Sequence, residues 1–181
     1  KTPLVIWLAE QLKLAGYHPG IISRGYGGNV RQVAEVFPDS NPWEVGDEPV
    51  LIAARTRCPV FVSANRIAAG ECLLASYPEC NVIISDDGLQ HYRMQRDIEI
   101  AVYDGAIGFG NGELLPAGPL REPLSRLDTV DALVRNGPVS KVSVKEHDAF
   151  EMRLDASGFY NLIDMKKKSQ PQDFSKQRIV A

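Results

Sequence analysis

The sequence lacks several features that would point to particular protein classes. No stretch approaches the roughly 20 consecutive apolar residues that a membrane-spanning helix needs, so no transmembrane helix is predicted. An excess of positive charge is also missing, and the formal net charge of -3 argues against nucleic acid as the main partner. Cysteine is scarce: Cys58, Cys72 and Cys80 show no metal-ligand spacing. Such a set predicts reduced, mostly buried thiols.

Apolar runs divide the chain into alternating helices and strands. Leu4, Leu8 and Leu12 share one face of a helix that begins near Pro3 and stops near Gly16. The same reasoning predicts helices at residues 3–15, 49–57 and 65–76, strands at residues 20–23, 60–62, 82–84, 98–103 and 132–134, and a loop with at most a short strand at residues 29–46. Because these strands are apolar throughout, the sequence predicts an α/β fold with a mostly parallel sheet and helices on both faces.

The pattern changes after about residue 140. Residues 150–154 alternate apolar and polar side chains, a glycine follows, and residues 159–162 resume, which predicts an antiparallel hairpin. Residues 164–176 are polar and predict a solvated linker. The sequence therefore predicts a core at residues 1–140 and the start of a small antiparallel β unit with a linker at residues 141–181.

The first two residues match the end of a phosphate-binding loop. Such a loop ends in Gly-Lys-[Ser/Thr] and leads directly into a helix, as Lys1-Thr2 does here. The lysine then reaches the terminal phosphates of a nucleotide and the hydroxyl binds Mg²⁺. Two residues alone also occur by chance. Support comes from Asp86 and Asp87, which follow a buried strand where phosphate-loop enzymes hold Mg²⁺, although strand-end acids are also common in turns.

A second acidic pair precedes a predicted helix. Asp47 and Glu48 lie in the block Gly46-Asp47-Glu48-Pro49. A purely structural interpretation is open at this point, in which Asp47 caps the helix and Glu48 favours its first turn. The pair is equally compatible with a role in catalysis.

Five blocks of the sequence together resemble tetraacyldisaccharide 4'-kinase. The blocks are Lys1-Thr2-Pro3, Ser23-Arg24-Gly25-Tyr26-Gly27, Gly46-Asp47-Glu48-Pro49, Ser85-Asp86-Asp87-Gly88-Leu89-Gln90-His91 and Gly110-Asn111-Gly112-Glu113-Leu114-Leu115-Pro116-Ala117-Gly118-Pro119-Leu120-Arg121-Glu122-Pro123. They occur in matching order over residues 1 to about 135, and the last two are long and specific. The resemblance implies a P-loop NTPase-like, nucleotide-binding core at residues 1–140.

The resemblance also implies an activity. The family uses ATP and Mg²⁺ to phosphorylate the 4'-hydroxyl of tetraacyldisaccharide 1-phosphate, which gives lipid IVA in lipid A biosynthesis. It works at the cytoplasmic face of the bacterial inner membrane. We therefore expect a transferase with ATP and Mg²⁺ as cofactors, a glycolipid substrate at the membrane surface, no nucleic-acid partner, and peripheral membrane association.

The matching motifs assign roles to individual residues. Lys1 would contact the β- and γ-phosphates and Thr2 would ligate Mg²⁺. Asp47 would be the base near the acceptor hydroxyl, and Arg121 would neutralise charge on the transferred phosphoryl group. The acidic surround of the metal would consist of Glu48, Asp86, Asp87 and Glu122. Residues 105–123, rich in Gly and Pro, are expected to form a mobile loop that carries Arg121 and Glu122.

Four residues are candidates for binding the acceptor: Arg24, Tyr26, Arg66 and His91. The planar donors of arginine suit a sugar phosphate, and the ring of Tyr26 can stack on a sugar face. Two structural alternatives stay open. Arg66 could be a solvated helix residue, and His91 could instead hold the Asp86-Asp87 turn by a hydrogen bond.

Parts of the family pattern fall outside this sequence. They are the phosphate-loop glycines, any N-terminal membrane-associating helix, and a C-terminal motif block whose histidine is paired with the aspartate base. We expect the 181-residue chain alone to bind ATP poorly and to turn over little or nothing.

Three rival functions share part of this pattern. A nucleotide-driven switch or assembly ATPase also has Lys-Thr and a strand-end aspartate, but it has no need of an acceptor aspartate or of the loop that ends in Arg121-Glu122. A kinase of a soluble small molecule and a non-catalytic scaffold are the others. The fold alone cannot separate them, because P-loop folds carry many activities.

Overall fold

The computed structural model describes residues 1–28, 32–138, 149–155, 158–160, 164 and 166–175. The chain divides into two compact units, Lys1–Ala101 and Val102–Ala181. Each unit is described below by itself. Among the described residues, no helix has both the length and the apolar character needed to cross a bilayer.

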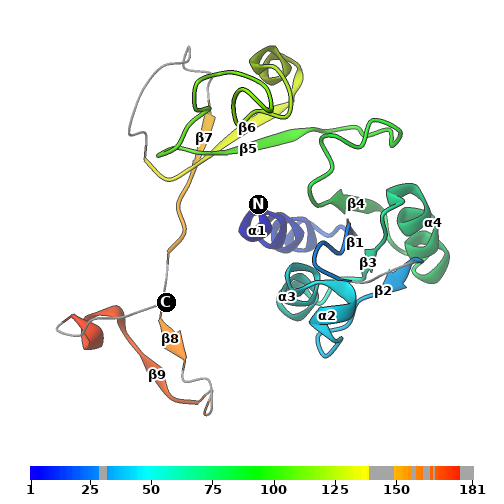
Figure 1. Cartoon of the computed structure of the whole chain (residues 1–181). Helices are drawn as coiled ribbons and strands as arrows, with labels where there is room; N and C mark the ends of the chain where they lie inside the picture. The colour runs from blue at the N-terminus through cyan, green and yellow to red at the C-terminus, as the bar shows by residue number, and fades with distance from the viewer. Residues whose placement is uncertain (29–31, 139–148, 156–157, 161–163, 165, 176–181) are drawn as a thin grey trace. The chain divides into compact units, whose positions relative to one another are not determined.

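A four-stranded sheet forms the centre of the first unit (Figure 1), with the order β2-β3-β1-β4. Its strands are β1 (Pro19–Ser23), β2 (Ala34–Glu35), β3 (Val60–Val62) and β4 (Val82–Ser85). β1 pairs in parallel with β3 and with β4, while the short β2 runs antiparallel to β3 at the edge. All five residues of β1 are buried. The predicted strands and their mostly parallel arrangement are therefore confirmed.

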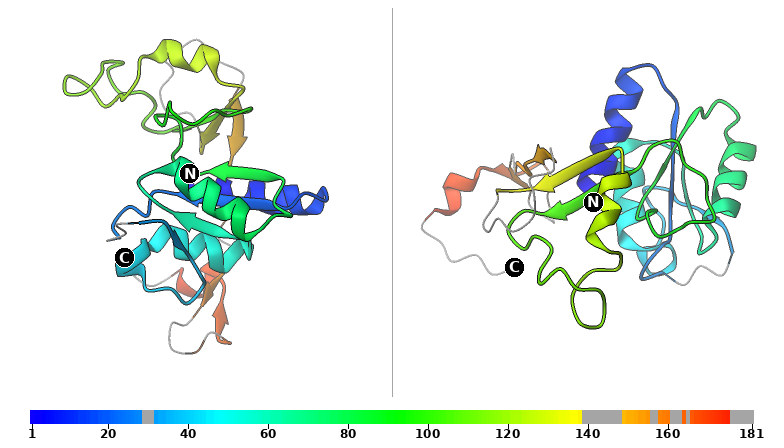
Figure 2. Two further views of the ribbon diagram at one scale, coloured as in Figure 1. Left: turned by 90° about the vertical axis from the view of Figure 1, so that its right-hand side faces the viewer. Right: turned by 90° about the horizontal axis from the view of Figure 1, so that it is seen from above.

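Helices cover both faces of this sheet, as predicted (Figure 2). The helices are α1 (Thr2–Leu14), α2 (Pro42–Val45), α3 (Asp47–Thr56) and α4 (Arg66–Ser76). Successive strand residues point to opposite faces, so Ile21 packs with α1 and α3 while Ile22 packs with α4. The larger cluster comprises Val5, Ala9, Ile21, Val36, Val45, Ile52, Ala53, Cys58, Val60 and Val62. The smaller one comprises Ile22, Phe61, Ala69, Leu73 and Cys80.

The cysteines follow the sequence prediction in most respects. Cys58 and Cys80 are buried, Cys72 is exposed, and all three are free thiols. The two buried thiols pack in the apolar clusters on opposite faces of the sheet, so they act as small core residues.

The second unit contains two small sheets. The larger has the order β5-β6-β7, formed by β5 (Ile100–Asp104), β6 (Ala132–Asn136) and β7 (Ala149–Met152), and β5 begins in the last residues of the first unit. The smaller is an antiparallel pair of β8 (Phe159–Tyr160) and β9 (Lys168–Ser169). The described part of this unit also includes two short 3-10 helices, η1 (Leu124–Thr129) and η2 (Pro171–Phe174).

The predicted hairpin between residues 150–154 and 159–162 is wrong. β7 pairs in parallel with β6, with Leu133 opposite Ala149. Phe159 pairs instead with Ser169, so part of the predicted solvated linker forms a strand and a 3-10 helix. The physical reason is that period-two alternation identifies a strand but does not select its partner. Residues 161–163 lie outside the described residues.

The antiparallel β unit of the prediction therefore corresponds to β8 and β9, which lie further along the chain. The domain boundary predicted near residue 140 falls among residues 139–148, which lie outside the described residues. That boundary stays a prediction; compactness divides the chain after Ala101.

Candidate active site

Two predicted site residues stand at the start of α1, at the carboxyl edge of the first unit's sheet. Lys1 is the N-cap of this helix, and its carbonyl accepts hydrogen bonds from the backbone N–H groups of Leu4 and Val5 at 2.9 and 3.2 Å. Pro3 suits the first turn, because its fixed φ matches a helix and its missing N–H has no intrahelical role there. The remaining amides at the start of a helix carry partial positive charge and favour anions.

Their side chains reach the predicted acids on other elements. Lys1 Nζ lies 2.6 Å from Asp87 Oδ1. The hydroxyl of Thr2, a buried residue, donates a hydrogen bond of 3.0 Å to Glu48 Oε1 in the first turn of α3. Residues at the start of the chain, near position 48 and near position 87 therefore meet at one place in the first unit.

Asp86 is the buried acid of this group, with 4% of its surface exposed. Its backbone N–H continues the parallel ladder by donating to the Ile22 carbonyl at 2.9 Å. Its Oδ2 accepts a hydrogen bond from Ser23 Oγ at 3.3 Å, while Oδ1 is buried and has no hydrogen-bond partner within the described part of the chain. An unpaired buried carboxylate oxygen is costly unless a cation or water completes it.

The surroundings of Asp86 disfavour its charged form. Burial raises the pKa of its carboxyl above the ordinary value, and the negative charges of Glu48 and Asp87 act in the same direction. Lys1 and the hydrogen bond from Ser23 lower that pKa in part. The protein therefore holds this carboxyl where a further positive charge would stabilise it.

Asp47 is the first residue of α3. Gly46 occupies the N-cap position with φ of +91°, and Asp47 Oδ1 accepts the N–H of Glu48 at 2.9 Å. The interpretation of Asp47 as the N-cap is therefore wrong, although its carboxylate does meet one orphan amide of the first turn. A Cβ on Gly46 would lie 2.7 Å from the Tyr26 carbonyl. The loop after β1, which carries Arg24 and Tyr26, thus packs directly against the start of α3.

The acceptor-side candidates differ in burial. Arg66 is only 4% exposed, so its interpretation as a solvated helix residue is wrong. Its Nη1 donates to the Ser63 carbonyl at 2.7 Å, while its Nε is buried without a hydrogen-bond partner among the described residues. Burial lowers the pKa of this guanidinium, as does the charge of Arg24, whereas Asp86 and Asp87 raise it. Arg66 thus lies within the field of the predicted metal-side acids.

His91 and Tyr26 present their side chains differently. Burial lowers the pKa of the His91 imidazole, and the charges of Arg66, Arg93, Arg96 and Arg24 act in the same direction. The backbone N–H of His91 donates to the Gly88 carbonyl at 2.9 Å, so His91 does help to close the turn after β4, but through its main chain. Tyr26 is 83% exposed and its ring is available to a ligand.

The residues present fit a magnesium ion that arrives with a nucleotide. Among the described residues there is no cluster of three or more His, Cys, Asp and Glu side chains that could hold a metal ion by itself. Mg²⁺ in nucleotide sites needs less than such a cage: it takes one or two protein oxygens and completes its shell with phosphates and water. The Thr2 hydroxyl, Glu48 and the unpartnered Oδ1 of Asp86 are oxygens of the required kind.

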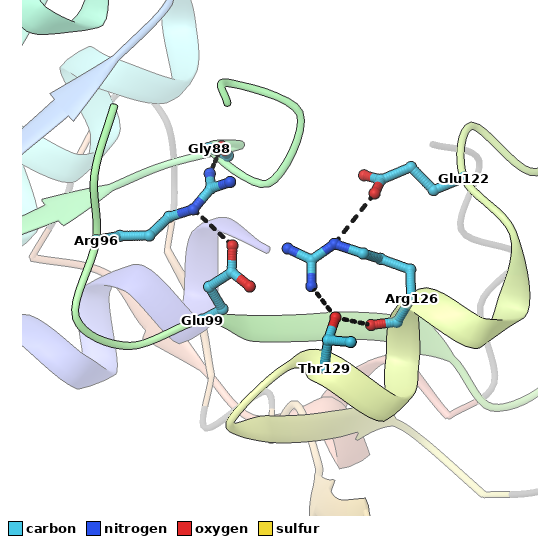
Figure 3. A network of polar contacts seen from close by, with 6 residues as sticks. All are labelled: Gly88, Arg96, Glu99, Glu122, Arg126 and Thr129. Atoms are coloured by element: carbon cyan, nitrogen blue, oxygen red, sulfur yellow. Dashed lines mark hydrogen bonds and ion pairs between the residues drawn. The ribbon is translucent and has the colours of Figure 1, made fainter. Parts of the chain in front are cut away.

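Arg121 and Glu122 belong to the second unit. Arg121 is exposed, and Glu122 Oε2 lies 3.2 Å from Arg126 Nε in an ion pair (Figure 3). Inside the preceding loop, Leu115 N donates to the Leu120 carbonyl at 2.8 Å. The convergence of Arg121 and Glu122 with the residues of the first unit stays a prediction.

Sequence reasoning missed several residues of the site. Ser23, which bonds Asp86, lies in a motif block that was recognised without a role for it. Ser63 supports Arg66 from a strand end. Arg96 and Glu99 form an ion pair beside the turn after β4 (Figure 3), and no pattern in the sequence singles them out.

The fold is that of the P-loop kinase class: a mostly parallel sheet, a helix that begins at Lys-Thr, and acids at the carboxyl edge. The model of the tetraacyldisaccharide-1-P 4'-kinase family matches residues 1–181. The chain belongs to the tetraacyldisaccharide-1-P 4'-kinase family.

Individual relatives agree with this family. The tetraacyldisaccharide 4'-kinase of Methylobacillus flagellatus is 61% identical over 137 residues, which cover 76% of this chain and 41% of that protein. The one of Azoarcus sp. strain BH72 is 50% identical over 182 residues, which cover 100% of this chain and 53% of that protein. The crystal structure of "apo" form LpxK from Aquifex aeolicus in complex with ATP is similar with a TM-score of 0.73 and 28% identity, over 98% of this chain and 56% of that one. The chain thus spans about half the length of the relatives it matches.

Proposed function

We propose that the protein transfers the terminal phosphoryl group of ATP to the 4'-hydroxyl of tetraacyldisaccharide 1-phosphate, giving lipid IVA in lipid A biosynthesis. The observation that carries this proposal is the meeting of Lys1 and Thr2 with Asp87 and Glu48 around the buried Asp86, in a chain of this kinase family. Phosphoryl transfer depends mainly on positioning and charge neutralisation, which these groups can supply.

The nucleotide side of the site is assigned to α1. Lys1 would exchange its ion pair with Asp87 for the β- and γ-phosphates of ATP. Thr2, Glu48, Asp86 and Asp87, together with Glu122, would hold Mg²⁺, which neutralises phosphate charge when bound. The Thr2 hydroxyl would then turn from Glu48 to the metal. ATP binding by the Aquifex aeolicus relative supports this assignment.

The acceptor side is assigned to Asp47 and the loop after β1. Carboxylates are weak bases, so Asp47 would orient the 4'-hydroxyl and take its proton late in the transfer. The exposed Tyr26 would stack on a sugar ring. The positive charges of Arg24 and Arg66, with His91 close to both, would bind the phosphate already on the disaccharide. Arg121 would offset charge on the transferred group.

A lipid acceptor places the reaction at a membrane surface. We propose that the protein acts peripherally at the cytoplasmic face of the bacterial inner membrane. The name of the acceptor, a tetraacyldisaccharide, indicates four acyl chains, which would lie in the membrane. Nucleic acid is not expected as a partner, since the net charge of -3 offers no general attraction to phosphate backbones.

The substitution Asp47→Ala tests the proposal. It is made in a longer protein that contains this chain and is as long as the relatives. We expect 4'-phosphorylation to fall by about 100-fold or more, the size typical for loss of a positioned base. ATP affinity should stay unchanged within about twofold, because Asp47 is assigned to the acceptor hydroxyl and not to the phosphates. Radiolabelled product and calorimetric ATP binding are the two measurements.

The outcome that contradicts the proposal is also defined. Unchanged turnover in Asp47→Ala would remove this residue from the mechanism. ATP hydrolysis by the unsubstituted protein that does not depend on added disaccharide lipid would favour a nucleotide-driven switch instead.

A further inference from the structure

The turn that carries Asp86 and Asp87 is held from outside by an arginine with no assigned role. Arg96 Nη1 donates a hydrogen bond of 2.7 Å to the carbonyl of Gly88. Its Nε lies 2.5 Å from Glu99 Oε1 (Figure 3). All four residues of this arrangement, including Asp87, lie in the first unit.

The Gly88 carbonyl is the fixed point of the turn. It accepts the backbone N–H of His91 at 2.9 Å as well as the guanidinium of Arg96, so both lone pairs of this oxygen are used. On its other side, a Cβ on Gly88 would lie 2.6 Å from Ser85 Oγ. Gly88 thus packs closely against the end of β4, and its carbonyl is held by two hydrogen bonds. Both contacts restrict movement of the turn.

Arg96 is itself held in place. The side chains of Arg96 and Glu99 are only 20% and 15% exposed, so their ion pair is largely shielded from water. The guanidinium also lies over the Tyr92 ring at 5.9 Å from its centroid. Glu99 directly precedes β5, so the pair connects the turn after β4 to the start of the next strand. The planar guanidinium contacts Gly88 through Nη1 and Glu99 through Nε, two separate donors held in one fixed plane.

The turn gives Asp87 an unusual backbone. Asp87 has φ of +53°, in the left-handed region that non-glycine residues rarely adopt. From this conformation its Oδ1 reaches 2.6 Å from Lys1 Nζ. A residue held against its preference relaxes when its support is removed, so the Asp87 carboxylate would lose this position without the contact to Gly88.

We propose that Arg96 is a positioning residue, anchored by Glu99, which acts through the Gly88 carbonyl to keep the Asp86–Asp87 turn facing Lys1 and thereby sets the affinity for Mg·ATP. This inference rests on the proposed function, because it takes the two aspartates as the metal side of the site. Arg96 touches neither nucleotide nor acceptor in this role.

The substitution Arg96→Gln tests the positioning role, with Arg93→Gln as the matched control. Both are made in a longer protein that contains this chain and is as long as the relatives. Arg93 is exposed, lies three residues away and carries the same charge. We expect Arg96→Gln to weaken Mg·ATP binding by about 10- to 100-fold, as loss of a group that orients metal ligands does, and Arg93→Gln to change it by less than about twofold. Arg96→Lys keeps the charge but not the planar fork, so it should weaken binding nearly as much.

Binding is measured by calorimetry without acceptor, and circular dichroism gives the folded fraction of each variant. A separate structural readout is the amide NMR shift of Asp87, which should move in Arg96→Gln without nucleotide and stay in Arg93→Gln. Three results would overturn the inference: unchanged affinity in Arg96→Gln, equal losses in both glutamine variants, or a loss no larger than the unfolded fraction explains.

The proposed function is tested separately by acceptor phosphorylation in the unsubstituted protein. If that protein binds Mg·ATP but does not phosphorylate the disaccharide lipid, the proposed function fails while the comparison of Arg96 with Arg93 still decides the inference. An unsubstituted protein that binds no Mg·ATP would overturn both.

Discussion

At the scale of single residues, the site combines groups that would be unfavourable elsewhere. Asp86 is buried with one oxygen unpaired, and Arg66 is buried with its Nε unpaired. Asp87 adopts a left-handed backbone. Polar groups in such states cost stability unless a ligand completes them. Asp87 contacts Lys1, whose charge also acts on Asp86, and Arg66 interacts electrostatically with both aspartates. Under the proposed function, a triphosphate and its metal would provide the missing partners.

Asp86→Asn should separate stability from function. The pKa of Asp86 is raised in the folded protein, first by burial, so folding favours its protonated form. The stability that this group contributes is fully present below the ordinary aspartate pKa of about 3.9 and is lost as pH rises through the raised folded pKa. At neutral pH the wild type has lost this contribution to its free energy of unfolding, whereas the asparagine variant, which does not titrate, has not.

We therefore expect Asp86→Asn to be more stable than wild type at pH 7, by on the order of 1 kcal/mol, and equally stable at about pH 3.5. Its Mg·ATP affinity should be weaker, because a metal-side carboxylate is gone. Urea unfolding at a series of pH values gives the first quantity and calorimetry the second. A variant less stable than wild type at pH 7 would show that the Asp86 carboxylate is satisfied in the folded protein.

The two arginines show which part of the site the sequence could not reveal. Arg66 was a candidate because the planar donors of arginine suit a sugar phosphate, but its burial depends on where α4 meets β3, a long-range property. Arg96 belongs to no recognised motif. Its proposed role follows from its contact with Gly88, eight residues earlier in the chain. Residues that form part of a recognised motif were found, and residues that hold such motifs in place were not.

At the scale of elements, local pattern predicted the first unit well. Apolar runs gave β1, β3 and β4, and the helical spacing of leucines gave α1. These succeed because the type of element follows from the spacing of its own apolar residues. Burial follows less closely: β4 is at most half-buried, and the buried residues of α1 are Thr2, Val5 and Ala9, while the leucines at this spacing are half-buried. The hairpin failed because pairing is a relation between distant segments: β7 pairs with β6 across residues 137–148, and neither strand's sequence states that choice.

Gly20 and Gly70 give a matched test of packing between β1 and α4. A Cβ on Gly20 would lie 2.6 and 2.7 Å from the two Leu73 Cδ atoms and 2.9 Å from Cys80 Sγ. Gly20→Ala should therefore lower the free energy of unfolding by about 1–3 kcal/mol, as overpacking does.

Gly70 lies inside α4, where a Cβ would meet only Ile83 Cδ1 at 3.8 Å, an ordinary contact. Gly70→Ala should raise the free energy of unfolding by about 0.5–1 kcal/mol, since alanine favours helix over glycine. Chemical denaturation of both variants measures the difference. Equal effects in the two would mean that α4 does not pack closely on β1.

At the scale of the whole molecule, the residues assigned to the proposed site are divided between the two units. The first unit holds Lys1, Thr2, Asp47, Glu48 and the Asp86–Asp87 turn, whereas Arg121 and Glu122 belong to the other. The ion pair of Glu122 with Arg126 orients the Glu122 carboxylate within its own unit.

Hydrogen exchange with and without Mg·ATP tests whether the second unit completes the site, in a longer protein that contains this chain and is as long as the relatives. We expect slower exchange in residues 86–91, because nucleotide would fix the turn, and in residues 119–123, if Arg121 and Glu122 join the phosphates. Because ligand binding stabilises the folded state, we expect the exchange rates of these amides to fall by at least about 10-fold at saturating Mg·ATP. Protection of the first segment without the second would remove Arg121 and Glu122 from the site.

The separation of the two apolar clusters by the sheet has an evolutionary consequence. The helices α1 and α3 rest on one face, and α4 rests on the other. Because the sheet separates the two clusters, we expect mutations that remodel one layer to leave most of the packing of the opposite layer in place. Under the proposed function, Arg66 is an acceptor-side residue on the α4 layer, whereas Lys1, Thr2 and the α3 acids lie on the other. Variation in α4 could thus alter acceptor binding in descendants of this fold while the residues of the other layer are inherited unchanged.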